Sequence, residues 1–373
     1  MTASFFLLFS ILLAAPGWSS ETRTDPSLYT KKLEDTVLNQ NLTLEKRIKA
    51  LKVLLNDQMS DGYLQRTFCI WDPLGKHGPV AVATNHQILR SRHYGLDLTI
   101  RVFQSEDALV SKFTTDDDCD AMLVRGASAR DFNRFLATVE APGAITSRDQ
   151  LYLLAQVLAK PDIAPRLTDD KYTALGLVTL GGNHIFVRSR EHATLKSLKG
   201  LPMAVPDTDR GNAWLTSALN GEPQSASLPA TVQYFSEGAV EVMVAPDIGY
   251  LIMGQGQTGD ASVAMQPVIG QSTLQLIGRA DRFPPGLALI LREDFLFRFN
   301  NYARLLDKEL ANIPAGFWIT PSDEERQTLA VNSQKTRLAL REQGYYDRSM
   351  LRLARKIRCR FEPNNRECTN PVE

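Results

Sequence analysis

The sequence predicts an α/β protein built from two lobes, with a helical extension at the C-terminus. Three observations support this fold class. From Arg66 onward, short apolar segments alternate with amphipathic ones, which is the pattern of parallel α/β folds. About 350 residues follow the predicted signal peptide, more than one hydrophobic core usually holds. Beyond residue 300 the apolar spacing is mainly helical.

The N-terminal segment predicts export. Residues 1–19 hold an apolar run from Phe5 to Ala15, followed by Gly17 and Ser19, small residues suited to signal peptidase. No Lys or Arg precedes the run, so an uncleaved membrane anchor is the alternative to a cleaved signal peptide. No later segment is apolar over a length that would cross a membrane. We therefore expect a soluble protein of the periplasm.

The charge balance argues against one class of partner. The 42 Lys and Arg residues equal the 42 Asp and Glu residues, so the formal net charge is zero. Proteins that bind nucleic acid usually carry a basic excess. We expect no nucleic-acid partner.

Four cysteines in an exported chain suit two disulfides, for which three pairings exist. We favour Cys359 with Cys368, which lie close together in a tail rich in Pro and Asn. Cys69 then pairs with Cys119, since both lie at or beside predicted strands that can be neighbours. A zinc site is the alternative, but no C-x-x-C spacing supports it.

Residues 20–65 predict a polar leader and then a helix, with Leu44, Ile48 and Leu51 at helical spacing. The first lobe is expected over 66–170, joined by about 260–300. Its predicted elements, in order, are a strand at 67–71, a helix at 78–94 that ends at Gly95, a strand at 96–103, a helix that begins at Ser105, a strand at 120–124 and a helix at 148–158.

The second lobe is expected over 171–259, and the helical extension over 301–373. The predicted elements from here on are strands at 175–180, 184–187, 203–205, 231–234, within 238–246, 274–277 and 287–291, and helices at 214–219, 293–310 and from Ser322. The segment 351–360 is strongly basic. We interpret it as a solvated helix face, with a contact to an anionic surface as the alternative.

The motifs of several enzyme classes are missing. There is no G-x-S-x-G and no P-loop. The letters of residues 254–259 match a dinucleotide fingerprint, but Pro267 leaves little room for the helix that should follow. His77, His86 and His93 are close in sequence, yet the last two would lie about two helical turns apart, which is wide for a shared metal ion. We expect no enzyme activity, no cofactor and no metal.

Binding explains the polar residues at strand ends better than catalysis does. Ligands of open α/β sheets gather at the carboxyl ends of strands, and two lobes that share crossing strands suit a hinged binding protein. Arg125 is the strongest of these candidates, because a guanidinium can clamp a carboxylate at two points. The ligand-binding candidates are Asp72 and Gly75 after the first strand, Arg125 after the third, Asn183 at the Gly-Gly turn, and Asp207 and Arg210 after a second-lobe strand.

Five segments carry a resemblance to a family. Ser197-Leu-Lys-Gly-Leu-Pro-Met-Ala-Val-Pro resembles the element that opens the second lobe of periplasmic solute-binding proteins, and residues 238–246 resemble the small-residue segment after it. Residues 68–75, 119–126 and 130–135 are similar to a group of solute-binding proteins distantly like the binding components of TRAP carboxylate transporters. The resemblance covers about residues 66–300 and implies a type II-like periplasmic-binding-protein fold.

One departure bears on the ligand. TRAP carboxylate binders usually carry an arginine on the strand after the lysine-glycine element, and here that strand is Met203-Ala204-Val205. Arg125 or Arg210 would have to take that role. We therefore predict capture of a small polar, possibly anionic, solute between the lobes, with membrane permease subunits as partners. The alternative is a ligand-free interaction or signalling module of the cell envelope, and an exported hydrolase is the least favoured.

Overall fold

The computed structural model describes residues 26–253 and 262–373. The predicted signal peptide at 1–19 and the glycine-rich segment at 254–259 lie outside the described residues. Within the described part, nine strands form one sheet in the order β2-β1-β3-β8-β4-β7-β5-β6, with β9 paired to β8. No helix of this part is long and apolar enough to cross a membrane.

The first lobe follows the predicted alternation of strand and helix. Its parallel strands are β1 (Leu64–Trp71), β2 (Leu96–Phe103) and β3 (Ala121–Arg125), and β1 lies between the other two. The helices α3 (Pro79–Ser91) and α4 (Glu106–Thr115) connect them. Both turns follow local chemistry, because Gly95 ends the first connection at φ +83° and the Ser105 side chain caps α4.

Two long strands join the lobes. The strands β4 (Tyr172–Val187) and β8 (Val263–Arg279) pair antiparallel from one lobe into the other. The two strands expected around Gly181-Gly182 are therefore one, and 274–277 is only the last part of β8. The chain continues as one strand through Gly181, since β4 pairs with β8 on both sides of it. This position requires glycine, because its φ is +96° and a Cβ here would collide with Asp247.

The second lobe repeats the arrangement of the first. Its strands are β5 (Pro202–Pro206), β6 (Glu222–Ala226) and β7 (Val242–Pro246), and its helices are α8 (Arg210–Ala218), α9 (Leu228–Glu237) and α10 (Ile248–Met253). The predicted strand at 231–234 is wrong, since these residues lie in α9. Ser227 caps this helix, and the buried positions 228, 231, 232 and 235 have helical spacing. The polar edge strand β6 was not predicted.

A 26-residue helix, α11 (Pro285–Leu310), runs along β4. The strand predicted at 287–291 is wrong, because these residues form the beginning of α11. All five are buried there, and a short, fully apolar run does not distinguish a strand from a buried helix. The remaining helices before it are α1 (Pro26–Leu38), α2 (Leu44–Leu54), α5 (Arg134–Ala137), α6 (Arg148–Leu158) and α7 (Ala164–Leu167).

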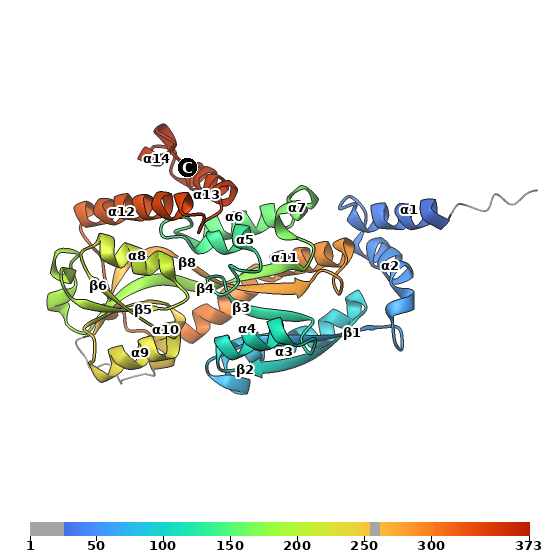
Figure 1. Cartoon of the computed structure of the whole chain (residues 1–373), viewed down its shortest axis with the longest axis horizontal. Helices are drawn as coiled ribbons and strands as arrows, with labels where there is room; N and C mark the ends of the chain where they lie inside the picture. The colour runs from blue at the N-terminus through green and yellow to red at the C-terminus, as the bar shows by residue number, and fades with distance from the viewer. Residues whose placement is uncertain (1–25, 254–261) are drawn as a thin grey trace, which may run out of the picture.

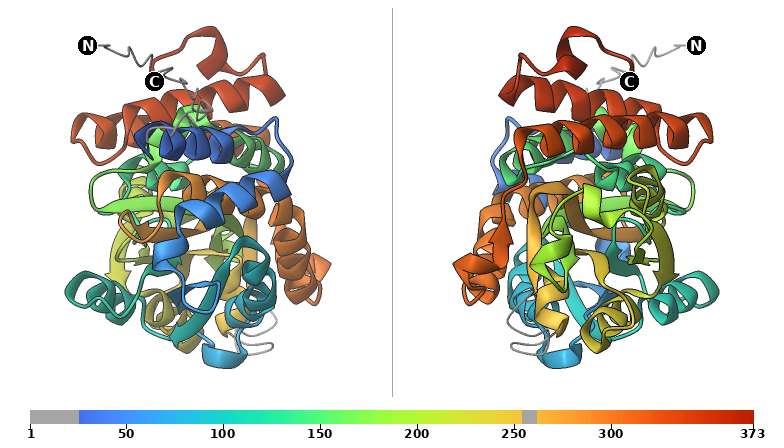
Figure 2. Two further views of the ribbon diagram at one scale, coloured as in Figure 1. Left: turned by 90° about the vertical axis from the view of Figure 1, so that its right-hand side faces the viewer. Right: turned by 90° about the vertical axis from the view of Figure 1, so that its left-hand side faces the viewer.

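The C-terminal extension is helical, as predicted. It consists of α12 (Asp323–Glu342), α13 (Arg348–Phe361) and α14 (Arg366–Thr369), preceded by the short strand β9 (Trp318–Ile319). Helix α12 packs on α8 of the second lobe, whereas α13 packs on α6 and α5 beside the first. These helices form a layer along one side of the molecule and span both lobes (Figures 1 and 2).

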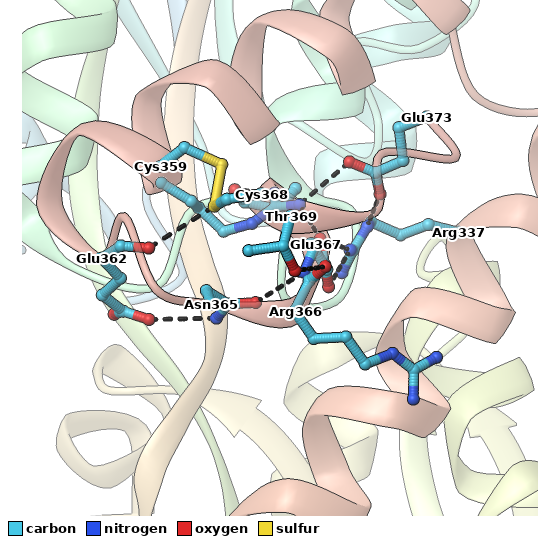
Figure 3. Close-up of a disulfide and its surroundings, with 11 residues drawn as sticks. Arg337, Cys359, Glu362, Asn365, Arg366, Glu367, Cys368, Thr369 and Glu373 are labelled. Atoms are coloured by element: carbon cyan, nitrogen blue, oxygen red, sulfur yellow. Dashed lines mark hydrogen bonds and ion pairs between the residues drawn. A yellow bond between two sulfur atoms is a disulfide. The ribbon is translucent and has the colours of Figure 1, made fainter.

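The two predicted disulfides are confirmed. Cys69 in β1 bonds to Cys119, two residues before β3, with the Cα atoms 5.7 Å apart. Cys359 at the end of α13 bonds to Cys368 in α14, with the Cα atoms 5.6 Å apart (Figure 3). The first bridge fastens two neighbouring strands of the first lobe, and the second folds the tail back onto α13.

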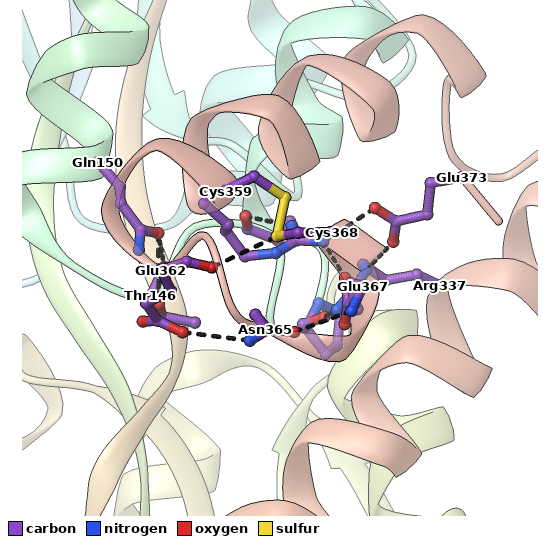
Figure 4. Close-up of polar contacts among 12 residues, drawn as sticks. Thr146, Gln150, Arg337, Cys359, Glu362, Asn365, Glu367, Cys368 and Glu373 are labelled. Carbon is purple, nitrogen blue, oxygen red and sulfur yellow. Dashed lines mark hydrogen bonds and ion pairs between the residues drawn. A yellow bond between two sulfur atoms is a disulfide. The ribbon is translucent and has the colours of Figure 1, made fainter. Parts of the chain in front are cut away.

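A buried ion-pair cluster lies beside the second disulfide (Figure 4). Arg337 of α12 and Arg358 of α13 both bind the carboxylates of Glu367 and Glu373. The two arginines hold the pKa of Glu367 below its usual range, although burial alone would raise it. Arg358 is thus a buried structural residue, and the prediction of a wholly solvated basic face at 351–360 is wrong for this position.

Candidate functional site

The strand ends of the two lobes meet around Arg125, the last residue of β3. Its guanidinium donates to Glu106 Oε2 at 2.8 Å and 2.6 Å, and its backbone amide donates to Glu106 Oε1. Nη2 also donates to Thr208 Oγ1 of the second lobe at 3.1 Å. Burial would lower the pKa of Arg125, but the surrounding carboxyl groups, Glu106 foremost, together raise it. Arg125 therefore joins the lobes and is already paired.

Two more carboxylates surround this arginine. Glu140 accepts hydrogen bonds from the amides of Gly126, Ala127 and Thr273, and burial raises its pKa to about 7. Asp209 caps α8 through the Asn212 amide, and burial raises its pKa as well. We call Glu106, Arg125, Glu140, Thr208 and Asp209 the polar junction. It holds three carboxyl groups and one guanidinium.

The C-terminal extension covers the polar junction. Gly344 O accepts from Arg134 of the first lobe, and the Tyr345 hydroxyl donates to Thr208 O of the second lobe at 3.4 Å. The space left between Arg130, Glu140, Asp209 and the two tyrosines at 345 and 346 is only about 10 Å³. This side of the lobe interface is filled by protein.

The first two predicted ligand contacts form the turn after β1. Asp72 is fully buried, and its carboxylate accepts from the amides of Leu74 and Ala81, each at 2.9 Å. Gly75 adopts φ +74° in the same turn, a conformation that favours glycine. The geometry gives both residues a structural role at the rim of the first lobe.

The other predicted contacts are dispersed. Asn183 is buried in the crossing strand β4, where its Oδ1 accepts from Ser272 Oγ at 2.9 Å. Asp207 is exposed and binds the next backbone amide. Arg210 extends outward, donates to Gln343 Oε1 and lies over the rings of Trp214 and Tyr345. Across the two lobes, the structure brings Arg125 close to the loop of Asp207 through Thr208. The role of the six predicted residues in ligand binding stays a prediction.

A cavity of about 320 Å³ lies on the other side of the sheet. Residues from both lobes and from the elements that connect them line it: the loop after β1 (Leu74, His77), helix α3, the crossing strands (Thr179, Leu180), the start of α10 (Ile248) and helix α11. Leu74 and Val82 of its lining are exposed, so the cavity opens to solvent. Most of its lining is aliphatic or aromatic, and we call it the apolar cavity.

Several of the polar groups that line this space are already hydrogen-bonded to one another or to neighbouring residues. Asp294 of α11 is buried, and its Oδ1 accepts from Arg90 Nε and from the Tyr94 hydroxyl, each at 2.6 Å. The Tyr302 hydroxyl accepts from the Gln87 amide. Burial raises the pKa of both Tyr94 and Tyr302, so both phenols stay protonated.

The sequence did not single out Asp294, Tyr302 or Phe295 of α11 as site residues. Residues 287–291 were predicted as a strand and 293–310 as a helix with one apolar side, and neither was assigned to a ligand. An acidic residue inside an otherwise apolar helical stripe is the signal that points to Asp294. Two of the histidines that were considered and rejected as a metal site, His77 and His86, line the cavity. No metal-binding group of three or more side chains is present among the described residues.

Comparisons with known proteins agree with this architecture. Residues 77–373 match the model of the family described as solute-binding protein AdeT 1/2. The probable solute-binding protein AdeT1 of Acinetobacter baumannii is 25% identical over 308 residues, which is 80% of this chain and 98% of that protein.

Solved structures show the same fold at low sequence identity. A TRAP periplasmic solute binding protein from Desulfovibrio salexigens, with bound orotic acid, superposes with a TM-score of 0.65 at 12% identity over 79% of this chain and 99% of its own. A second one, from Haemophilus influenzae with bound L-gulonate, gives a TM-score of 0.61 at 12% identity over the same shares. The predicted two-lobed fold and the predicted resemblance are confirmed.

Proposed function

The chain belongs to the solute-binding protein AdeT 1/2 family, and from this premise we propose that it captures a small molecule in the apolar cavity. One observation carries the proposal. The space of about 320 Å³ is lined by both lobes, by the crossing strands and by the long helix α11. This volume is in the range of small-molecule sites.

The position of the cavity couples binding to the relative placement of the lobes. A solute there contacts Leu74 and His77 of the first lobe and Ile248 of the second. Contacts to both lobes stabilise the arrangement in which they are close. This is the coupling that a hinged binding protein requires.

We further propose that the protein works in the periplasm and hands its solute to a membrane permease. The apolar run at 5–15 supports export, and the solved neighbours are periplasmic solute binding proteins of TRAP systems. The two disulfides suit an oxidising compartment. Binding and delivery require no catalytic step.

A second function, a ligand-free envelope module, is favoured by one feature. The C-terminal helices bridge the two lobes through Arg134–Gly344 and Tyr345–Thr208 contacts, which oppose wide opening of the hinge. A module that only presents a surface to a partner does not need the hinge to open.

A thermal-shift screen separates the two functions. The panel comprises carboxylates, sugars, amino acids, polyamines and arylalkyl compounds, and binding to the folded state raises the melting temperature. We expect at least one class to stabilise the wild type but not Ala83→Phe, whose phenyl ring enters the cavity. Asn85→Phe on the same helix, outside the cavity lining, is the matched control and should keep the shift. Stabilisation by no class would favour the ligand-free module.

A further inference from the structure

We propose that the solute of the apolar cavity is a mainly hydrophobic molecule that carries one cationic nitrogen. This inference rests on the proposed function and specifies its ligand. It follows from the charges, the hydrogen-bond capacity and the aromatic surface of the lining.

Apart from its two histidines, the ionisable side chains of the lining that carry a full charge are negative. Among the lining residues that the structure describes there is no lysine and no arginine, whereas Asp294 and Glu309 are present. An anion moved from water into such a space loses its hydration and gains no opposite charge, which is costly. A carboxylate group is therefore excluded from the favourable ligands, and a cation is attracted.

The two carboxylates retain acceptor capacity. Arg90 and Tyr94 both bind Oδ1 of the buried Asp294, and no described group donates to its Oδ2. Arg90 is not part of the lining, because it lies against the rings of Tyr94 and Phe297. Glu309 at the exposed end of α11 has no ion-pair partner in the described part of the chain. An ammonium group can thus bind at the inner end or at the rim.

Aromatic rings add to this preference. Phe295 and Tyr302 lie 6.2 Å apart between ring centroids, and both belong to the lining, together with Phe68. Ring faces attract cations and also pack well against apolar groups. Aliphatic and aromatic side chains outnumber the polar ones in this lining, whereas the many hydroxyl groups of a sugar acid need polar partners.

The solved neighbours provide the contrast. The Desulfovibrio salexigens and Haemophilus influenzae proteins hold orotic acid and L-gulonate, both of which are acids. In this chain Arg125, the last residue of β3, is paired with Glu106 on the opposite side of the sheet from the cavity. The shared fold therefore does not bring a free guanidinium to the cavity.

Three probes of matched size test the proposal by calorimetry. Phenylbutylamine, phenylbutanol and phenylpentanoate share a phenyl ring and a four-methylene chain and differ in the head group. We expect the amine to bind at least tenfold more tightly than the alcohol or the carboxylate. Ala83→Phe should abolish binding of all three, and Asn85→Phe should leave it unchanged.

Two charge variants locate the head group. Asp294→Asn should lower the affinity for the amine about tenfold and change the affinity for the alcohol by at most about twofold. Because Arg90 and Tyr94 also depend on this carboxylate, Glu309→Gln is the second variant, with an expected loss of about threefold at the rim. An unchanged preference for the amine in both variants would contradict this assignment.

The outcomes distinguish the two proposals. If phenylpentanoate, orotate or L-gulonate binds as tightly as the amine, and Ala83→Phe abolishes that binding, the ligand class is wrong and the proposed function stands. Equal affinity of the amine and the alcohol would likewise contradict the proposal that the solute carries a cationic nitrogen. If no probe and no class of the screen binds, the proposed function fails, and this inference fails with it.

Discussion

The polar junction and the apolar cavity lie on opposite sides of the same lobe interface. In the polar junction, Arg125, Glu106 and Thr208 bind one another, and the remaining space is about 10 Å³. In the apolar cavity about 320 Å³ is open, and most of its lining is aliphatic or aromatic. Charged side chains at strand ends here hold protein to protein, whereas the space for a solute is bordered by apolar residues.

This difference changes what a polar residue at a strand end indicates. A side chain such as Arg125 is a good ligand contact only if its hydrogen-bonding groups are free. Here its partner Glu106 comes from the first turn of the helix that follows β2. The difference also divides the mutations into those that affect stability and those that affect binding.

The largest expected effect is on the stability of the polar junction. Glu106→Ala leaves the buried Arg125 without its main partner, so we expect the free energy of unfolding to fall by about 3–5 kcal/mol. The matched control is Asp307→Ala, which breaks the exposed pair with Arg148 and should cost at most about 1 kcal/mol. Urea denaturation measures both. Equal costs for the two variants would mean that the junction does not hold the lobes.

The second effect is a pH dependence that originates at Glu140. Its pKa is raised from 4.5 to about 7, so the folded state binds the proton more tightly than the unfolded state. The resulting stabilisation, about 3 kcal/mol, is fully present below pH 4.5 and is lost as the pH rises through 7. Unfolding free energies between pH 4.5 and 8 should therefore decline less steeply in Glu140→Gln than in the wild type. Parallel profiles would refute this assignment.

The third effect compares the space on the two sides. Ala137→Phe beside the polar junction overpacks a filled region and should cost about 1–3 kcal/mol. Ala83→Phe at the apolar cavity has room for the ring, so its cost should stay within about 1 kcal/mol. Thermal unfolding of the two variants is the measurement. A larger cost at Ala83 would show that the cavity is closed in solution.

The smallest effect concerns the exposed arginine of the C-terminal contact. Arg210→Ala removes one hydrogen bond to Gln343 and the stacking on two rings, so we expect a loss of about 0.5–1 kcal/mol. Solute affinity should not change, because Arg210 is not part of the cavity lining. A large fall in affinity would restore Arg210 as a ligand contact.

Much of the fold could be predicted from local chemistry. Gly95 and Ser105 marked their helix ends, and Cys69 and Cys119 were placed on neighbouring strands because the alternation of elements implied a parallel pair. The errors fell where local patterns are ambiguous. Residues 287–291 are apolar without a period, and Thr231–Tyr234 is rich in β-formers yet lies in a helix capped by Ser227.

The site was less accessible to prediction. The candidates were chosen as polar residues at strand ends, but whether Arg125 is free depends on Glu106, a contact across 19 residues. The cavity depends on how α3 and α11 pack against each other and over the sheet, and no local pattern determines that packing. Asp294 becomes notable only once its neighbours are known to be apolar.

The most direct test is the identity of the solute that the protein retains when it is purified from its native host. Mass spectrometry of the small molecules released by denaturation should find a mainly hydrophobic compound with a basic nitrogen, present in the wild type and in Asn85→Phe and missing in Ala83→Phe. A released carboxylate that Ala83→Phe retains equally well would contradict both the ligand class and the cavity that we assign to it.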